Sequence, residues 1–133
     1  MTDSESTKAA PSALPRLLVI DDEPMLAEAI RRMLFNDAQV TICHAVEPAL
    51  VLLAQGEKFD AILCDLMLPG TGGIGFHAEL ERSLPRLATR LGFVTGGAST
   101  DETEEFVRLN KSRVLDKPFT RQALLGMVKL LMV

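Results

Sequence analysis

Five short apolar runs alternate with stretches of helical periodicity, and this alternation limits the fold more than any other feature of the chain. The runs lie at 16–21, 39–44, 59–65, 91–95 and 113–116. Helical patterns or caps predict helices at 24–34, 47–55, 74–84, 99–110 and 121–132. Such alternation is typical of an α/β doubly wound fold, here with five parallel strands and five helices.

Local signals support individual elements. The first run, RLLVID, is apolar without alternation, as expected of a strand covered on both faces. The helix after it carries the stripe expected of an amphipathic helix, made by Leu26, Ala29, Ile30, Met33 and Leu34. In the second helix we expect Leu50, Leu53 and Ala54 to face inward. Pro85 is expected to close the third helix, and Thr120 to cap the last.

Length and composition exclude several classes of protein. A chain of 133 residues suits one domain, and a net charge of −4 argues against a nucleic-acid surface. There is no apolar run near 18 residues, so membrane insertion is not expected. We interpret the polar residues 1–15 as a disordered tail or boundary segment, and 16–133 as the domain. Cys43 and Cys64 are expected to be buried, reduced thiols.

Chemically informative residues follow four of the five predicted strands. The first strand ends at Asp21 and Asp22, the third at Asp65, the fourth at Thr95, and the fifth just before Lys117. The carboxyl ends of parallel strands share one edge of the sheet, where ligands bind in such folds. These residues are therefore expected to form one site.

The residue types at that edge suit phosphoryl chemistry. Three carboxylates repel one another unless a cation neutralises them, and oxygen ligands favour a hard ion, Mg²⁺ first. Lys117 and Thr95 can contact phosphoryl oxygens, and the backbone N–H of Gly96 can approach without a side chain in the way. Asp65 remains as a nucleophile that can form an aspartyl phosphate.

Four motifs in order resemble the receiver domain of two-component response regulators, over residues 16 to 132. They are VIDDE, LCDLMLPGTGG with proline four and glycine eight residues after the aspartate, FVTGG, and DKPF. The last two look most like receivers of hybrid sensor histidine kinases. The resemblance implies a flavodoxin-like (βα)5 fold with strand order 2-1-3-4-5.

The resemblance also implies a metal site. Asp22 looks like the direct Mg²⁺ ligand, together with Asp65 and the backbone carbonyl of Met67, and Asp21 assists through water. The Lys117–Pro118 bond is expected to be cis.

For the phosphoryl group, the resemblance makes Asp65 the phosphoacceptor. Thr95 looks like the switch hydroxyl and Lys117 like the ion-pair partner, and the backbone N–H groups of Leu66 and Gly96 are expected at the phosphoryl oxygens. The chain departs from the family at Val114, where an aromatic residue is common.

The implied function is a signalling module rather than an enzyme, although it assists its own phosphorylation and dephosphorylation. It would accept a phosphoryl group from a phosphohistidine of a sensor histidine kinase or a histidine phosphotransfer domain. Phosphorylation would change the conformation of a surface made by the fourth and fifth helices and the fifth strand, to which a downstream protein partner binds. We expect no direct nucleic-acid contact. The expected location is the cytoplasm, including the cytoplasmic part of a membrane-bound hybrid kinase.

Two other functions fit the sequence less well. A Mg²⁺-dependent phosphatase that passes through an aspartyl phosphate usually has a second aspartate two residues after the nucleophile, where this chain has Met67. A flavodoxin-like electron carrier needs a Ser/Thr-rich loop after the first strand and aromatics over the flavin. This chain has DDEP there and no Trp or Tyr.

Overall fold

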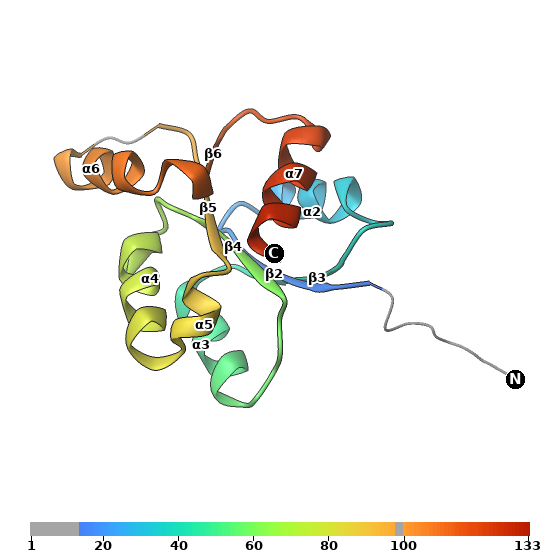
Figure 1. The fold of residues 1–133 in the computed structure, drawn as a ribbon, viewed down its shortest axis with the longest axis horizontal. Coiled ribbons are helices and arrows are strands. Elements are labelled where there is room, and N and C mark those ends of the chain that lie inside the picture. The colour runs from blue at the N-terminus through green and yellow to red at the C-terminus, as the bar shows by residue number, and fades with distance from the viewer. Residues whose placement is uncertain (1–13, 98–99) are drawn as a thin grey trace, which may run out of the picture.

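The computed structural model describes residues 14–97 and 100–133, so most of the expected tail at 1–15 lies outside the described residues. Its strands form one parallel sheet in the spatial order β3-β2-β4-β5-β6 (Figure 1). They span Arg16–Ile20 (β2), Gln39–Cys43 (β3), Ala61–Asp65 (β4), Leu91–Thr95 (β5) and Val114–Asp116 (β6). In chain order this is 2-1-3-4-5, which confirms the predicted topology.

The described residues contain six α-helices, one more than predicted. They are α2 (Pro24–Met33), α3 (Val46–Ala54), α4 (Gly72–Ser83), α5 (Pro85–Ala88), α6 (Asp101–Leu109) and α7 (Arg121–Leu131), with a 3₁₀ turn, η2 (Lys111–Arg113). The extra helix is α5. Pro85 ends α4 as expected but also starts α5, because proline suits the first position of a helix.

Two apolar cores lie on the two faces of the sheet. Successive strand residues point to opposite faces, so Leu17 and Val19 join the core under α2 and α7, while Leu18 and Ile20 join the core under α3 and α4. Figure 1 shows α2 and α7 on one side of the sheet and α3, α4 and α5 on the other. All five residues of β4 and of β5 are buried, as predicted for strands covered on both faces.

The expected boundaries of α3 and β6 need correction. Helix α3 begins at Val46, so its inward stripe is Val46, Ala49, Leu50 and Leu53, and Ala54 is exposed. Arg113, expected in the last strand, belongs to η2.

The ends of the two C-terminal helices are well defined. The expected start of α6 at Ser99 lies outside the described residues, and Thr100 caps the helix. Thr120 caps α7 by accepting a hydrogen bond from the Ala123 N–H at 3.0 Å, as predicted.

Cys43 and Cys64 are free and buried. Across residues 14–97 and 100–133, each helix is too short or too polar to cross a membrane.

Candidate functional site

Three carboxylates meet where β2 and β4 end. These strands are hydrogen-bonded neighbours, with Ile20 opposite Cys64, so the acids that follow them come together. Asp21, Asp22 and Asp65 each offer an oxygen, and these atoms lie within 4.8 Å of one another. Asp21 and Asp65 are buried, and Asp22 is exposed. The sequence prediction that these acids form one cluster is confirmed.

Burial in this cluster disfavours negative charge. Desolvation raises the pKa of Asp21, and the nearby Asp65 carboxylate raises it further, against a hydrogen bond of 2.8 Å from the Glu23 N–H. A bound cation would relieve that repulsion. Because all three donors are carboxylate oxygens, the cluster fits a hard divalent ion such as Mg²⁺.

The amide that reaches Asp65 differs from the predicted one. The Leu66 N–H donates to the Val94 carbonyl at 2.9 Å as part of the sheet, so it is not available to a phosphoryl group. The Met67 N–H donates to Asp65 Oδ1 at 3.0 Å instead. The expectation for Leu66 is therefore corrected to Met67.

The ends of β5 and β6 bring the remaining predicted residues to the same edge. Thr95 lies opposite Asp116, which places Lys117 one residue beyond the pair. The Thr95 side chain is buried, and its Oγ1 accepts a hydrogen bond from the Gly97 N–H at 3.1 Å. Gly96 is exposed at this edge. The Lys117–Pro118 peptide is cis, as expected.

Lys117 contacts two acids from different elements, Asp65 at the end of β4 and Glu23 at the N-cap of α2. Its Nζ lies 3.6 Å from Asp65 Oδ2 and 3.2 Å from Glu23 Oε1. Burial lowers the pKa of Lys117, but the carboxylates of Asp65, Glu23 and Asp21 outweigh this effect and raise it. From the sequence, Glu23 was placed near the site, directly after the acidic pair, but it was given no role there.

The loop after β4 packs against the end of that strand, next to Asp65. Gly70 and Gly72 have φ of 75° and 72°, in the left-handed region that glycine adopts without strain. Gly73 then packs directly on the strand end, where its N–H donates to the Leu66 carbonyl at 3.2 Å. The loop therefore closes tightly onto the residue that follows Asp65.

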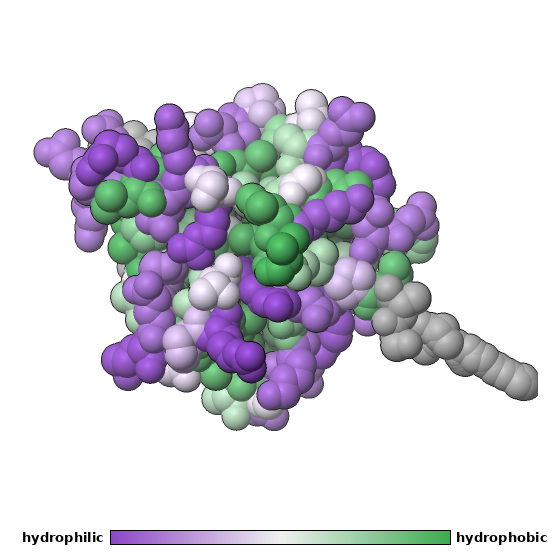
Figure 2. Space-filling model, viewed as in Figure 1, coloured by the Kyte–Doolittle hydropathy of each residue, from purple (hydrophilic) through white to green (hydrophobic). Residues whose placement is uncertain are grey.

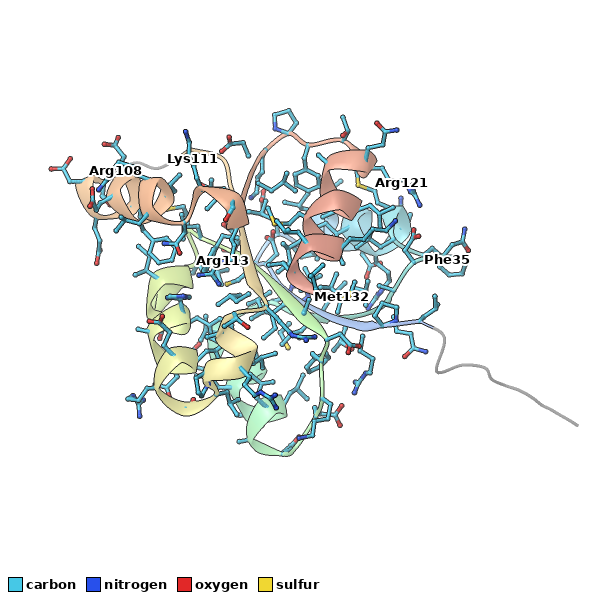
Figure 3. All side chains as sticks on the ribbon, viewed as in Figure 1. Phe35, Arg108, Lys111, Arg113, Arg121 and Met132 are labelled. Carbon is cyan, nitrogen blue, oxygen red and sulfur yellow. The ribbon has the colours of Figure 1, made fainter. Side chains whose placement is uncertain are left out.

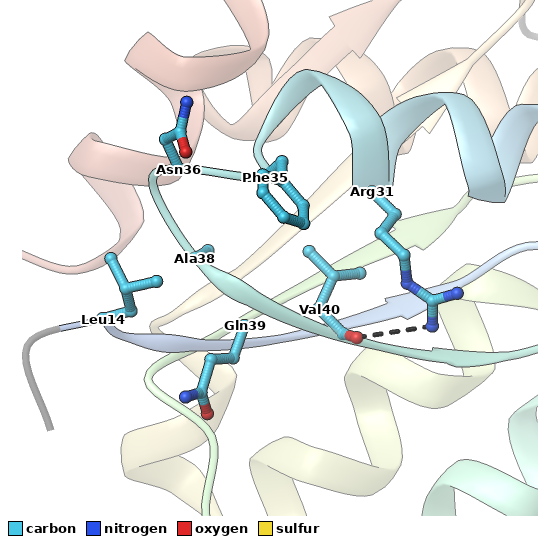
Figure 4. A pocket seen from close by; sticks show the side chains of 7 residues that line it. All are labelled: Leu14, Arg31, Phe35, Asn36, Ala38, Gln39 and Val40. Atoms are coloured by element: carbon cyan, nitrogen blue, oxygen red, sulfur yellow. Dashed lines mark hydrogen bonds between the residues drawn. The ribbon is translucent and has the colours of Figure 1, made fainter. Parts of the chain in front are cut away.

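A hollow elsewhere on the molecule is not part of this site. It is lined by Leu14, Arg31, Phe35, Asn36, Ala38, Gln39 and Val40 (Figure 4). These residues surround the amino ends of β2 and β3, whereas the acids follow the carboxyl ends.

Together, fold and site define a doubly wound α/β domain with an acidic cluster suited to a divalent cation and a lysine at the carboxyl edge of its sheet. The family model described as the response regulator receiver domain matches residues 17–129. The chain belongs to this family, and as a receiver domain it is a phosphoacceptor module of two-component signalling.

Curated relatives and solved structures agree with this assignment. The transcriptional activator protein PfeR of Pseudomonas aeruginosa is 35% identical over 115 residues, which are 80% of this chain and 34% of PfeR. The response regulator MprA of Mycobacterium avium is 30% identical over 121 residues, 88% of this chain and 50% of MprA. The chain thus spans about a third to a half of the length of these relatives.

A CheY-like response regulator receiver domain protein from Methanospirillum hungatei has a similar structure. The TM-score is 0.76 at 26% identity, covering 90% of this chain and 94% of the other.

Proposed function

We propose that Asp65 accepts the phosphoryl group in this domain. The observation that carries the proposal is its position: buried at the end of β4, within 4.8 Å of two further acids and 3.6 Å from the Lys117 ammonium. In the transfer, a carboxylate oxygen of Asp65 bonds to phosphorus while the bond between phosphorus and the donor's histidine nitrogen breaks. The electron pair leaves with the histidine.

For the metal, we propose that Asp22, Asp65 and the Met67 carbonyl hold Mg²⁺, with Asp21 acting through water. When bound, the ion neutralises negative charge on the acids and on the phosphoryl oxygens. The close approach of the three carboxylates supports this assignment, because a cation would relieve the repulsion between them.

The chain's own groups orient the transferred phosphoryl group. The N–H groups of Met67 and Gly96 and the Thr95 hydroxyl supply hydrogen bonds, and Lys117 supplies a positive charge. Such positioning and neutralisation account for most catalysis of phosphoryl transfer. Met67 lies where a phosphatase would carry a second acid that transfers a proton. Without that acid, a long-lived aspartyl phosphate is favoured over repeated hydrolysis.

The partners follow from this role. Receiver domains interact with histidine kinases or phosphotransfer proteins. We propose a sensor histidine kinase or a histidine phosphotransfer domain as donor, and a downstream protein that binds the surface of α6, β6 and α7. We place the domain at 16–133 and in the cytoplasm.

Mass spectrometry after incubation with acetyl phosphate and Mg²⁺ tests the proposal. We expect one base-labile phosphoryl adduct on the wild type and none on Asp65→Asn. The control Asp101→Asn, which removes an exposed carboxylate from α6, should be phosphorylated normally. An adduct that persists in Asp65→Asn would refute the assignment, and rapid release with many turnovers would favour a phosphatase.

A further inference from the structure

Lys117 makes its hydrogen bond to a residue outside the set that binds metal or phosphoryl group. Its Nζ donates to Glu23 Oε1 at 3.2 Å, whereas Asp65 Oδ2 lies at 3.6 Å, beyond hydrogen-bonding distance. The ammonium is therefore shared between Glu23, its hydrogen-bond partner, and Asp65, with which it forms a longer ion pair. Lys117 and Glu23 are 94 positions apart, so the pair ties the end of β6 to the start of α2.

Glu23 has a hydrogen-bonded backbone and a largely exposed side chain. Its N–H donates to Asp21 Oδ1 at 2.8 Å, and its carbonyl accepts from the Ala27 N–H at 3.1 Å as the first bond of α2. Its side chain is nevertheless 63% exposed, against 22% for Lys117. The carboxylate of Glu23 therefore lies at the exposed edge of the site, while its backbone is held by two hydrogen bonds.

Such a pair is easily exchanged. Ion pairs with an exposed partner contribute little, because water competes for both charges. A phosphoryl group on Asp65 adds charge and acceptor oxygens next to Lys117. The ammonium then has a stronger partner than Glu23 within reach.

From this geometry we infer that Glu23 is a positioning residue that competes with the phosphoryl group for Lys117. Before phosphorylation it shares the ammonium with Asp65. Afterwards Lys117 turns to the phosphoryl oxygens and Glu23 returns to solvent. The inference rests on the proposed role of Asp65. It implies that Glu23 makes the phosphorylated state less stable than it would be without this carboxylate.

Binding of beryllium fluoride, a phosphoryl stand-in, tests the competition by calorimetry at saturating Mg²⁺. We expect Glu23→Gln to bind it about two- to fivefold more tightly than the wild type, the size expected for loss of an exposed pair. Glu28→Gln is the matched control, because it removes the same charge from the same helix where the partner is Arg31. It should change the affinity little.

A double-mutant cycle separates competition for Lys117 from a general effect of charge. Lys117→Met keeps the aliphatic stem and removes the ammonium. In that background Glu23→Gln should have no effect on beryllium fluoride affinity. The inference would be overturned if Glu23→Gln raised the affinity for beryllium fluoride equally with and without Lys117, or did not raise it at all. Either result would leave the proposed function standing. If the wild type failed to bind beryllium fluoride, the proposed function would fall first and this inference with it.

Discussion

At the scale of single residues, Gly73 fixes the loop beside Asp65. A Cβ at this position would lie 2.9 Å from the Leu66 Cα and 3.1 Å from the Asp65 carbonyl oxygen. Both are backbone atoms of the strand end, so they cannot move aside without moving Asp65. The glycine is therefore required by close packing, not by an unusual φ.

We expect Gly73→Ala to lower the free energy of unfolding by about 1–3 kcal/mol, the usual cost of overpacking. Urea denaturation measures this change. The same variant should be phosphorylated more slowly by acetyl phosphate, because the strand end that carries Asp65 must shift.

Gly126→Ala provides the matched control. A Cβ there meets nothing within 4 Å, and the residue lies on the exposed side of α7. This substitution should stabilise the protein by about 0.4–1 kcal/mol, because alanine restricts the unfolded chain. A Gly73→Ala variant as stable as Gly126→Ala would show that the loop adapts.

At the scale of elements, α6 is held to the body by few side chains. Thr103 is its buried residue, Phe106 and Val107 are partly buried, and Leu109 is 65% exposed. Figure 1 shows α6 at the edge of the molecule, and Figure 2 shows a largely hydrophilic surface there with a small apolar patch. This helix belongs to the surface proposed to respond to phosphorylation.

The anchor of α6 is an aromatic contact. The Phe106 ring packs edge-on against Phe93 with centroids 5.0 Å apart, and against His77 at 5.5 Å. Phe93 lies two residues before Thr95 on β5, so both side chains point to the same face of the sheet. Val114, opposite Phe93 on β6, has no aromatic ring. The aromatic contact between β5 and α6 is therefore the one that Phe93 makes with Phe106.

We expect Phe106→Ala to weaken the attachment of α6 by about 1–3 kcal/mol, less than for a fully buried phenylalanine. Hydrogen exchange should then show faster exchange of the α6 amides than in the wild type.

Phe35→Ala is the control, because that ring is 75% exposed at the opposite end of the sheet (Figures 3 and 4). Its α6 amides should exchange as in the wild type. Unchanged α6 exchange in Phe106→Ala would contradict the assigned anchor.

At the scale of the whole molecule, His77 links pH to stability. Desolvation lowers the pKa of His77, and Arg113, whose Nη2 lies 3.4 Å from Nε2, lowers it further against the opposing effect of Glu81. Arg113 also donates a hydrogen bond to the Ala88 carbonyl at 2.8 Å, which keeps its guanidinium beside His77. The folded protein therefore favours the neutral imidazole.

The sign of the effect follows from proton linkage. The unfolded chain takes up a proton at histidine near the usual pKa of about 6.5, whereas the folded chain does so only at lower pH. The contribution of His77 to stability is thus present above pH 6.5 and is lost as pH falls below it. A neutral replacement removes this loss.

We expect the free energy of unfolding of the wild type to fall more steeply between pH 7.5 and pH 5.5 than that of His77→Gln. Glutamine stays neutral and can still accept a hydrogen bond from Arg113. Urea titrations at several pH values measure the slopes, with the exposed His44→Gln as control. Equal slopes for His77→Gln and wild type would rule out His77 as the source.

Sequence periodicity predicted the strands and five of the helices, because each depends on local patterns of apolar residues and caps. The motif residues Asp21, Asp22, Asp65, Thr95 and Lys117 were placed at one edge because parallel strands share a direction. The failure to predict α5 also has a local cause. Its four residues are too few to show a helical period.

Only the tertiary structure decided which groups pair within the site. The Leu66 amide bonds to Val94 on the neighbouring strand, so Met67 takes its place beside Asp65. Lys117 donates its hydrogen bond to Glu23 at 3.2 Å, although Asp65 Oδ2 lies only 3.6 Å away. The sequence by itself determined which residues reach the edge of the sheet. Partner choice depends on ångström-scale differences between segments far apart in the chain, and only folding brings those segments together.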